Sequence, residues 1–453
     1  MKLFGTNGVR GIVNESMTPE IAMKLAQSLA TYMNGEGTVV VGNDTRISGR
    51  MLKSAVISGL LSSGMKVTDL GCVPTPALQN YVKKSKEASA GIIVTASHNP
   101  REYNGIKLIS EDGTEFSREN ESAVEDIYFK GEFLKASWEN TGNYKKELNA
   151  NEMYVNDIVS LVDSELIKSC NFKVAIDTGC GAGSLTLPLL LKKLGCKTIS
   201  INAQPDGTFP WRNPEPVESS LTELSKIVST SQCDLGIAHD GDADRTVFLD
   251  ENGKFLDEDL MLAAVGKFIL KETKGPIVTP VSSSSMMGDI AKEAGVDIYW
   301  TRVGSIDVAY KMKEVDAVYG GEGNGGLIFP KHQFCRDGGM TAAVVLDIIA
   351  KNKMKVSKFR DAVSSYVNIK IKENIVDPKK VVEKIQKEIS LSDGMLDINK
   401  TDGVKITCEK GWILIRPSGT EEIVRITAEA KNKTDAEKLI EIGKNILRKA
   451  VTD

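Results

Sequence analysis

The stretch TVVVGNDTRISG at residues 38–49, together with MLKSAVISGLLSSG at 51–64, decides the predicted fold of this chain. The first part is a run of β-branched apolar residues that ends in a polar loop, which is typical of a buried strand. The second part carries apolar residues at helical spacing and ends at a glycine, which predicts an amphipathic helix. Two further predicted strands follow, KVTDLG at 66–71 and SAGIIVTASHNP at 89–100.

This order of elements recurs twice more along the chain. The second copy runs from KVAIDTGCGAGS at 173–184 to CDLGIAHDGDADR at 233–245, and the third from GPIVTPVSSSS at 275–285 to VDAVYGGEGNGG at 315–326. Strands that alternate with helices indicate βαβ units and a mostly parallel sheet. Because ligands bind beyond the carboxyl ends of such strands, we expect the three polar loops that end the copies to serve one cleft.

The pattern changes from about residue 367, where strands follow one another through short turns and a long amphipathic helix closes the chain. Such an order predicts an antiparallel α+β domain. A length of 453 residues also suits about three or four domains. We therefore predict three similar α/β domains with mixed, mostly parallel sheets at 1–150, 151–252 and 253–366, and a C-terminal α+β domain with an antiparallel sheet at 367–453.

The composition excludes several classes of protein. Hydrophobic residues make up 41% and charged residues 26%, which is ordinary for a globular protein and excludes disorder and fibrous repeats. A formal net charge of −4 gives no electrostatic reason to expect nucleic-acid binding. The sequence contains no membrane-length apolar run and no signal-peptide pattern, so no membrane partner is expected. Seven scattered cysteines without CxxC pairs favour reduced thiols and a cytoplasmic protein.

The sequence DGDADR at 240–245 carries Asp240, Asp242 and Asp244 at alternate positions after a predicted strand. Three such carboxylates repel one another unless a cation neutralises them. Oxygen ligands without thiolates favour Mg²⁺, Mn²⁺ or Ca²⁺ over Zn²⁺. An EF-hand loop is disfavoured because Arg245 stands at position 6, where the turn needs glycine, although Glu251 fits position 12. A solvated acidic turn is the remaining alternative.

The sequence TASHNP at 95–100 places Ser97 and His98 directly after an apolar strand. Such a serine is most often a helix cap or turn residue, and its neighbours do not match the nucleophile elbow of α/β-hydrolases. The chain has three histidines, and His98, His239 and His332 each lie in or near one of the polar loops. This grouping favours a functional role for the loop that contains Ser97.

The sequence GEGNGG at 321–326 formally matches the glycine pattern of dinucleotide-binding proteins. That pattern requires a helix next, but LIFPK follows here, so nicotinamide-cofactor binding is disfavoured. Glycines at these positions allow a ligand to approach the backbone closely. Glu322 and Asn324 then offer hydrogen bonds to sugar hydroxyls, and an exposed turn is the alternative.

The sequence RPSGTEE at 416–422 combines a guanidinium group, two hydroxyls and a run of backbone N–H groups after a strand. This chemistry suits a phosphate, whereas an ordinary hairpin turn is an equally good interpretation of the motif alone. The chain has no Walker A motif, so a phosphate site would not imply nucleotide hydrolysis. A metal triad, a strand-end serine, a hydroxyl-binding loop and a phosphate loop together favour phosphoryl transfer.

With these motifs, and with FGTNGVRG at 4–11 and NGIK at 104–107, the chain resembles the α-D-phosphohexomutase family over essentially its whole length. The resemblance implies a heart-shaped arrangement of four domains around a central cleft. It also implies that Ser97 carries the phosphoryl group. The residues implied as ligands of one Mg²⁺ per chain are Ser97, Asp240, Asp242 and Asp244.

The resemblance implies further roles around that centre. Arg10 and Arg245 would neutralise the transferring phosphoryl group, and Lys107 with His98 would supply or support acid–base chemistry. The residues expected to bind the sugar are Gly304, Glu322 and Asn324. The residues expected to hold the non-reacting phosphate are Arg416, Ser418, Gly419, Thr420 and Arg425.

The sugar loop departs from many family members, because Asn324 and Gly326 stand where serine and histidine are common. Whether His332 replaces that histidine is left open by the sequence. The loop and the first-domain sequence resemble archaeal phosphoglucosamine mutases, which implies interconversion of glucosamine 6-phosphate and glucosamine 1-phosphate. The implied activator is glucosamine 1,6-bisphosphate or a similar hexose 1,6-bisphosphate. Phosphomannomutase/phosphoglucomutase activity is the close alternative, and a Mg²⁺-dependent sugar phosphatase and a non-catalytic sugar-phosphate sensor are the others.

Overall fold

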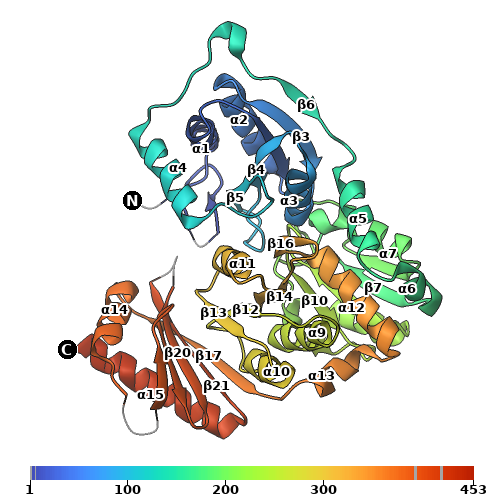
Figure 1. The fold of residues 1–453 in the computed structure, drawn as a ribbon, viewed down its shortest axis with the longest axis vertical. Coiled ribbons are helices and arrows are strands. Elements are labelled where there is room, and N and C mark those ends of the chain that lie inside the picture. The colour runs from blue at the N-terminus through green and yellow to red at the C-terminus, as the bar shows by residue number, and fades with distance from the viewer. Residues whose placement is uncertain (1–2, 6, 392–394, 419–421, 453) are drawn as a thin grey trace. The chain divides into compact units, whose positions relative to one another are not determined.

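The computed structural model describes residues 3–5, 7–391, 395–418 and 422–452 (Figure 1). The chain divides into two compact units, one formed by 1–258 with 324–358 and the other by 259–323 with 359–453. Within the described residues, no helix combines the length and the apolar character that a membrane crossing requires.

The first unit begins with a six-stranded sheet in the order β1-β5-β4-β2-β3-β6. Strand β2 pairs in parallel with β3 and β4, whereas β5 is antiparallel to both β4 and β1. The strands are β1 (Val9–Ile12), β2 (Thr38–Asn43), β3 (Lys66–Cys72), β4 (Ala88–Val94), β5 (Tyr103–Ser110) and β6 (Tyr144–Lys146). The helices of this region are α1 (Pro19–Tyr32), α2 (Gly49–Ser62), α3 (Thr75–Lys84) and α4 (Arg118–Lys130).

A second sheet in the same unit has the order β11-β10-β9-β7-β8. Strand β7 pairs in parallel with β8 and β9, and β10 is antiparallel to β9. The strands are β7 (Lys173–Asp177), β8 (Lys197–Ile201), β9 (Leu235–His239), β10 (Thr246–Leu249) and β11 (Phe255–Leu256). The helices are α5 (Ala150–Ser160), α6 (Ser164–Cys170), α7 (Leu187–Lys193) and α8 (Thr222–Thr230).

The third copy of the repeat supplies parallel strands to the second unit and an antiparallel pair to the first. In the second unit, β12 (Ile277–Pro280) pairs in parallel with β13 (Ile298–Thr301) and β14 (Tyr319–Glu322). In the first unit, β15 (Gly326–Phe329) pairs antiparallel with β16 (Gln333–Arg336). The accompanying helices are α9 (Glu258–Glu272), α10 (Met286–Ala294), α11 (Ser305–Glu314), α12 (Gly338–Asn352) and α13 (Phe359–Ala362).

The last part of the second unit is a five-stranded antiparallel sheet in the order β17-β21-β20-β19-β18. Helices α14 and α15 accompany it (Figure 1). The strands are β17 (Val367–Asn374), β18 (Met395–Asn399), β19 (Val404–Cys408), β20 (Gly411–Pro417) and β21 (Ile423–Ala430). The helices are α14 (Pro378–Glu388) and α15 (Lys433–Thr452).

The three sequence repeats share one topology. The parallel strands are ordered β3-β2-β4, β8-β7-β9 and β13-β12-β14, so in each copy the first strand is central and the last lies beside it. In the first two copies the next strand, β5 or β10, is antiparallel to the last of these strands, and the third copy is followed by the antiparallel pair β15 and β16. The sheets are therefore mixed. The predicted fold class, three mixed α/β domains and an antiparallel C-terminal α+β domain, is confirmed, whereas the heart-shaped arrangement stays a prediction.

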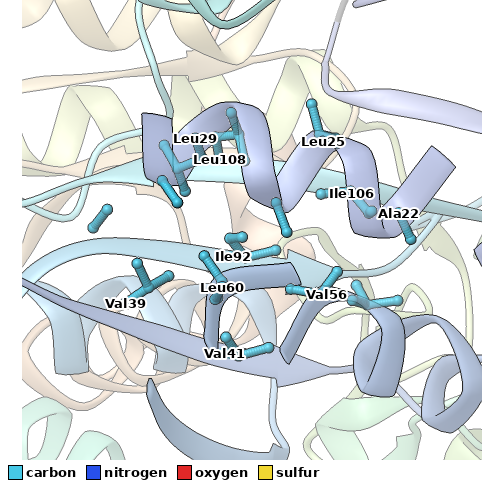
Figure 2. Close-up of a cluster of buried hydrophobic side chains, with 14 of the residues drawn as sticks. Ala22, Leu25, Leu29, Val39, Val41, Val56, Leu60, Ile92, Ile106 and Leu108 are labelled. Carbon is cyan, nitrogen blue, oxygen red and sulfur yellow. The ribbon is translucent and has the colours of Figure 1, made fainter. Parts of the chain in front are cut away.

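The core of the first sheet lies where α1 and α2 pack against β2, β4 and β5 (Figure 2). Leu29 from α1, Leu60 from α2, and Val41 and Ile92 from the sheet are fully buried there. The β-branched residues suit the pleated surface, and the leucines fill the space under the helices. This packing holds the carboxyl ends of β2 and β4, where the polar loops begin, in fixed positions.

The substitution Leu60→Ala should destabilise the first unit by about 2–5 kcal/mol, because it leaves a cavity in this core. Leu148→Ala is the matched control, since Leu60 is 0% exposed and Leu148 is 80% exposed. Urea unfolding of both variants followed by circular dichroism measures the effect. Equal unfolding midpoints for the two variants would contradict this account of the core.

Candidate active site

Ser97 is the third residue of the loop that follows β4, and it is completely buried. Its φ of 50° is in the left-handed region, which is unfavourable for a residue other than glycine. The Ser97 N–H donates to Thr95 Oγ1 at 2.9 Å, and the Thr95 hydroxyl donates to Asp44 Oδ2 at 2.6 Å. Local hydrogen bonds therefore hold the backbone in a conformation that turns the serine hydroxyl toward the neighbouring loop.

The buried Arg46, in the middle of the loop between β2 and α2, holds the serine loop through hydrogen bonds. Its guanidinium group donates to the carbonyl oxygens of Ser97 at 2.9 Å and Asn99 at 2.6 Å. It also donates to the carbonyl oxygens of Pro100 at 2.6 Å and Tyr103 at 2.8 Å. Sequence reasoning missed this residue. Its position after a strand of the first repeat was the available signal, because that is where ligand loops of such sheets lie.

The aspartate loop connects the antiparallel strands β9 and β10 and approaches the serine loop closely. The Ser97 hydroxyl donates to Asp240 Oδ2 at 2.9 Å. One carboxylate oxygen from each of Asp240, Asp242 and Asp244 lies within 4.8 Å of the others, and all three residues are buried. The structure thus brings the predicted serine and the three predicted aspartates together.

Each aspartate has at least one oxygen held by a protein donor. Asp242 Oδ2 accepts hydrogen bonds from Thr75 Oγ1 at 2.6 Å and from Lys107 Nζ at 3.1 Å. Asp244 Oδ2 accepts from Lys107 Nζ at 3.2 Å and from Arg336 Nη2 at 2.5 Å. Asp240 Oδ1 accepts from the Arg245 N–H at 3.2 Å. Thr75 and Arg336 were not among the residues predicted from the sequence.

The Oδ1 atoms of Asp242 and Asp244 are suited to binding a cation. Within the part of the chain that the structure describes, Asp242 Oδ1 and Asp244 Oδ1 are buried and accept no hydrogen bond. A buried carboxylate oxygen without a partner is costly, so a positive ligand is expected beside it. Because the donor set consists of oxygen atoms, a hard cation such as Mg²⁺ suits it best.

The surroundings shift the pKa values of Asp240 and Asp244 in opposite directions. Burial and repulsion from Asp242 and Asp244 raise the pKa of Asp240 well above its usual value. Burial alone would also raise the pKa of Asp244, but Arg336 and Lys107 lower it below the usual value. Likewise, burial alone would lower the pKa of Lys107, whereas Asp242 and Asp244 raise it. Mutual repulsion is therefore concentrated on Asp240, the aspartate that contacts Ser97.

Three further predicted residues surround Ser97. The Arg10 guanidinium donates to Asn99 Oδ1 at 2.7 Å and to the Ala96 carbonyl oxygen at 3.3 Å. His98 Nδ1 lies 3.4 Å from Ser97 Oγ, and burial together with the nearby Arg245 lowers the pKa of His98 to about 2. Arg245 Nη1 lies 3.5 Å from Glu215 Oε1. His98 is therefore neutral at pH 7, and the positive charges around Ser97 come from arginines.

The remaining histidines do not contact Ser97 in the interactions that the structure records. His332 is buried with Nδ1 at 3.3 Å from Asp157 and Nε2 at 3.2 Å from Asp337. Burial would lower the pKa of His332, but these two carboxylates raise it above the usual value. His239 is completely buried at the end of β9, and burial lowers its pKa to about 4.

In the second unit, Glu322 ends β14 and is buried. Its Oε1 accepts a hydrogen bond from the Gly304 N–H at 3.1 Å. Gly304 has a φ of 139° directly before α11, a conformation that favours glycine. The structure thus brings these two predicted sugar-loop residues together. Asn324 belongs to the first unit, where its Oδ1 accepts from the Gly326 N–H at 3.2 Å.

The predicted phosphate loop also lies in the second unit, at the hairpin between β20 and β21. Arg416 and Arg425 are directly opposite each other on these strands. Like charges in this position repel one another, so an anion between them would be stabilising. Ser418 is buried, and its N–H donates to the Ile423 carbonyl oxygen at 2.9 Å. The predicted residues Gly419 and Thr420 lie outside the described residues.

A single carboxylate connects the sugar loop and the phosphate loop within the second unit. Asp402 Oδ2 accepts hydrogen bonds from Arg416 Nε at 2.7 Å and from the Val303 N–H at 3.0 Å. Val303 precedes Gly304, which in turn donates to Glu322. Sequence reasoning missed Asp402, because it lies in an ordinary turn, TDG, that carries no functional signal. The sharing of one cleft by the two units stays a prediction.

Comparison with known proteins gives a family for this arrangement. Models of phosphoglucomutase/phosphomannomutase α/β/α domains I, II and III match residues 1–135, 152–253 and 257–366, and a model of the C-terminal domain matches 367–442. The chain belongs to the phosphoglucomutase/phosphomannomutase family. Members of this family are phosphohexomutases, so this family member is an enzyme of the isomerase class.

Individual family members match nearly the whole chain. A phosphoglucomutase/phosphomannomutase of Thermococcus kodakarensis is 45% identical, with 99% of each chain covered. A phosphoglucosamine/phosphogalactosamine mutase of Sulfurisphaera tokodaii is 41% identical, with 98% of this chain and 99% of its own covered. A crystal structure of a family protein from Burkholderia thailandensis has a TM-score of 0.88 at 23% identity, covering 99% of this chain and 97% of its own. At 23% identity, the similarity to the Burkholderia thailandensis protein shows a shared fold.

The close approach of the two loops in the first unit leads to a testable prediction. A Cβ atom on Gly241 would lie 2.5 Å from the carbonyl oxygen of Ser97, and a backbone atom cannot give way cheaply. Gly241→Ala should therefore displace Ser97 from Asp240 and lower kcat of the mutase reaction about 100-fold while the protein stays folded. Steady-state kinetics and circular dichroism measure the two effects.

The control for this substitution is Gly288→Ala. A Cβ atom there would meet a side-chain atom of Trp300 at 3.9 Å, which is ordinary contact. This variant should keep the kcat of the unaltered protein. If Gly241→Ala also kept the kcat of the unaltered protein, the distance between the serine loop and the aspartate loop would not matter for catalysis.

Proposed function

We propose that this chain is a phosphoglucosamine mutase that interconverts glucosamine 6-phosphate and glucosamine 1-phosphate. The reaction would proceed through a phosphorylated Ser97 and a 1,6-bisphosphate intermediate. The observation that carries this proposal is the 2.9 Å hydrogen bond between Ser97 Oγ and Asp240 Oδ2 inside a buried cluster of three carboxylates. A serine in that position can accept a phosphoryl group beside a cation that offsets the charge.

The residues that would hold one Mg²⁺ per chain are Asp240, Asp242 and Asp244, with an oxygen on Ser97 as a further ligand. The Oδ1 atoms of Asp242 and Asp244, which accept no hydrogen bond from the described part of the chain, support this assignment. When bound, Mg²⁺ supplies positive charge that offsets the negative charge of phosphoryl oxygens. Arg10 and Arg245 would add positive charge that neutralises the transferring phosphoryl group.

The chemistry of one half-reaction is a transfer between two oxygens. The bond between phosphorus and Ser97 Oγ breaks as a bond forms between phosphorus and a hydroxyl oxygen of the sugar phosphate. The proton of that sugar hydroxyl leaves to a protein base, and Ser97 Oγ regains a proton. We assign support of these proton movements to Lys107 and His98. After the bisphosphate turns around, the reverse transfer returns the other phosphoryl group to Ser97.

The second unit would bind the part of the substrate that does not react. A carboxylate such as Glu322, whose backbone partner Gly304 fixes it in the loop, accepts hydrogen bonds from sugar hydroxyls well. Glu322 and Gly304 are the sugar-binding residues proposed for the second unit, and Asn324 is proposed as a sugar-binding residue of the first unit. The facing cations Arg416 and Arg425 suit the dianionic phosphate, with Ser418, Gly419 and Thr420 proposed as its other partners.

The sugar is assigned from likeness to mutases that act on amino sugars. The relative from Sulfurisphaera tokodaii, named a phosphoglucosamine/phosphogalactosamine mutase, supports glucosamine 6-phosphate. The relative from Thermococcus kodakarensis, named a phosphoglucomutase/phosphomannomutase, favours the alternative that glucose or mannose phosphates are the substrates. Both alternatives use the same phosphoserine mechanism.

Four related assignments belong to the same proposal. The activator would be glucosamine 1,6-bisphosphate or a similar hexose 1,6-bisphosphate, which phosphorylates Ser97. The enzyme would act in the cytoplasm on a hexose phosphate, without a nucleic-acid or membrane partner. The domains would span 1–150, 151–252, 253–366 and 367–453.

Turnover of three sugar phosphates tests the proposal. The protein is incubated with Mg²⁺, a trace of glucose 1,6-bisphosphate, and glucosamine 6-phosphate, mannose 6-phosphate or glucose 6-phosphate. We expect the corresponding 1-phosphates to form, with kcat/KM about 10-fold or more in favour of glucosamine 6-phosphate, since kcat/KM measures discrimination in the transition state. Ser97→Ala is the control and should form no 1-phosphate.

The other outcomes select between the alternatives. A higher kcat/KM for mannose or glucose 6-phosphate would assign the chain as a phosphomannomutase/phosphoglucomutase. Release of inorganic phosphate in stoichiometric yield would instead indicate a sugar phosphatase. Unchanged activity of Ser97→Ala would contradict the phosphoserine mechanism itself.

A further inference from the structure

Thr75 makes an unusual pair of contacts with a distant loop. Its hydroxyl donates to Asp242 Oδ2 at 2.6 Å, and its N–H donates to the Asp242 carbonyl oxygen at 3.0 Å. Thr75 is 1% exposed and is the first residue of α3, between Pro74 and Pro76. It therefore holds Asp242, which is 167 positions away in the sequence, by both its side chain and its backbone.

The hydroxyl of Thr75 is not needed by its own helix. A threonine at a helix start ordinarily uses its hydroxyl to cap the helix's first N–H groups. The residue at the cap position of α3 is Pro74, and no side chain caps this helix. Two prolines beside Thr75 also restrict the backbone that presents the hydroxyl. The Thr75 hydroxyl therefore hydrogen-bonds to Asp242 and does not cap its own helix.

These contacts make the two carboxylate oxygens of Asp242 different from each other. Thr75 and Lys107 occupy Oδ2, whereas Oδ1 is buried and accepts no hydrogen bond within the described residues. Asp244 shows a similar division, because Arg336 and Lys107 occupy its Oδ2, whereas its Oδ1 accepts no hydrogen bond within the described residues and lies 4.0 Å from Arg245 Nε. Donors behind metal-binding carboxylates commonly fix which oxygen is the ligand.

We propose that Thr75 is a positioning residue for the divalent cation, which it serves by holding Asp242 so that Oδ1 is the ligand atom. Arg336 is its counterpart at Asp244. This inference rests on the proposed metal site and adds to it a contribution from the region that carries Ser97. The helix that follows β3 of the first sheet thereby sets the geometry of the aspartate loop of the second sheet.

Direct measurement of Mn²⁺ binding tests this inference without relying on turnover. Thr75→Val keeps the shape and charge of the side chain but removes the hydroxyl, so it should weaken Mn²⁺ binding about 10-fold or more. Thr75→Ser, which keeps the hydroxyl, should bind Mn²⁺ within about 2-fold of the unaltered protein. Electron paramagnetic resonance titration of free Mn²⁺ gives the dissociation constants.

The matched control is Thr341→Val. Thr341 lies in the first turn of α12, is completely buried, and donates its hydroxyl to the Asp337 carbonyl oxygen at 2.6 Å. The change removes a buried threonine hydroxyl without touching an aspartate of the triad, so the Mn²⁺ affinity should not change. Thr75→Ala carries the same expectation as Thr75→Val if the added methyl group of valine impairs folding.

Kinetics provide a second readout. The Mg²⁺ concentration for half-maximal activity should rise in Thr75→Val by the same factor as the Mn²⁺ dissociation constant, while KM for the sugar phosphate stays constant. Equal Mn²⁺ affinity of Thr75→Val and the unaltered protein would overturn this inference and leave the proposed function intact. Failure of the unaltered protein to bind Mn²⁺ would overturn both.

Discussion

Three aspartates are buried together in one short loop of the first unit, and the surrounding residues must stabilise their negative charges. Asp240, Asp242 and Asp244 lie out of water within reach of one another, so their charges must be offset locally. Lys107, Arg336 and Arg245 supply positive charge beside them, and the Oδ1 atoms of Asp242 and Asp244, which accept no hydrogen bond within the described residues, are the reason to expect a divalent cation. Ser97 donates to Asp240, whose pKa is raised by burial and by repulsion from the other two aspartates. In the proposed function, a cation and a phosphoryl group would meet there.

Repetition of one topology explains how distant segments reach this site. In the first two copies, the strand beside the central one ends in a polar loop and is followed by an antiparallel strand, so the serine loop and the aspartate loop are equivalent parts of similar sheets. Specific side chains then join them. Arg46 holds the carbonyl oxygens of the serine loop, and Gly241 lets the aspartate loop approach it. Within the second unit, Asp402 joins the sugar loop to the phosphate loop in a comparable way.

The sequence was sufficient to predict the fold class, because apolar β-branched runs and glycine-ended helices recur at three places with one order. It also gave reason to predict Ser97 and the aspartates as site residues, since their loops directly follow such runs, and the structure places these residues together. It could not identify Thr75 or Arg336, whose roles depend on contacts with residues 167 and 92 positions away. Strand β18, Met395–Asn399, carries little sequence signal, because its residues alternate only weakly between apolar and polar. Pairing with β19 creates this strand.

The central claim is that Ser97 itself carries the phosphoryl group, and transfer of a radioactive label tests it most directly. The protein is incubated with glucose 1,6-bisphosphate labelled with phosphorus-32 in both phosphates, in the presence of Mg²⁺, and then digested and mapped. Our account predicts one labelled peptide, with the label on Ser97 and its loss when an excess of unlabelled sugar phosphate is added. A label on another residue, or an unlabelled protein that still converts sugar phosphates, would contradict the account.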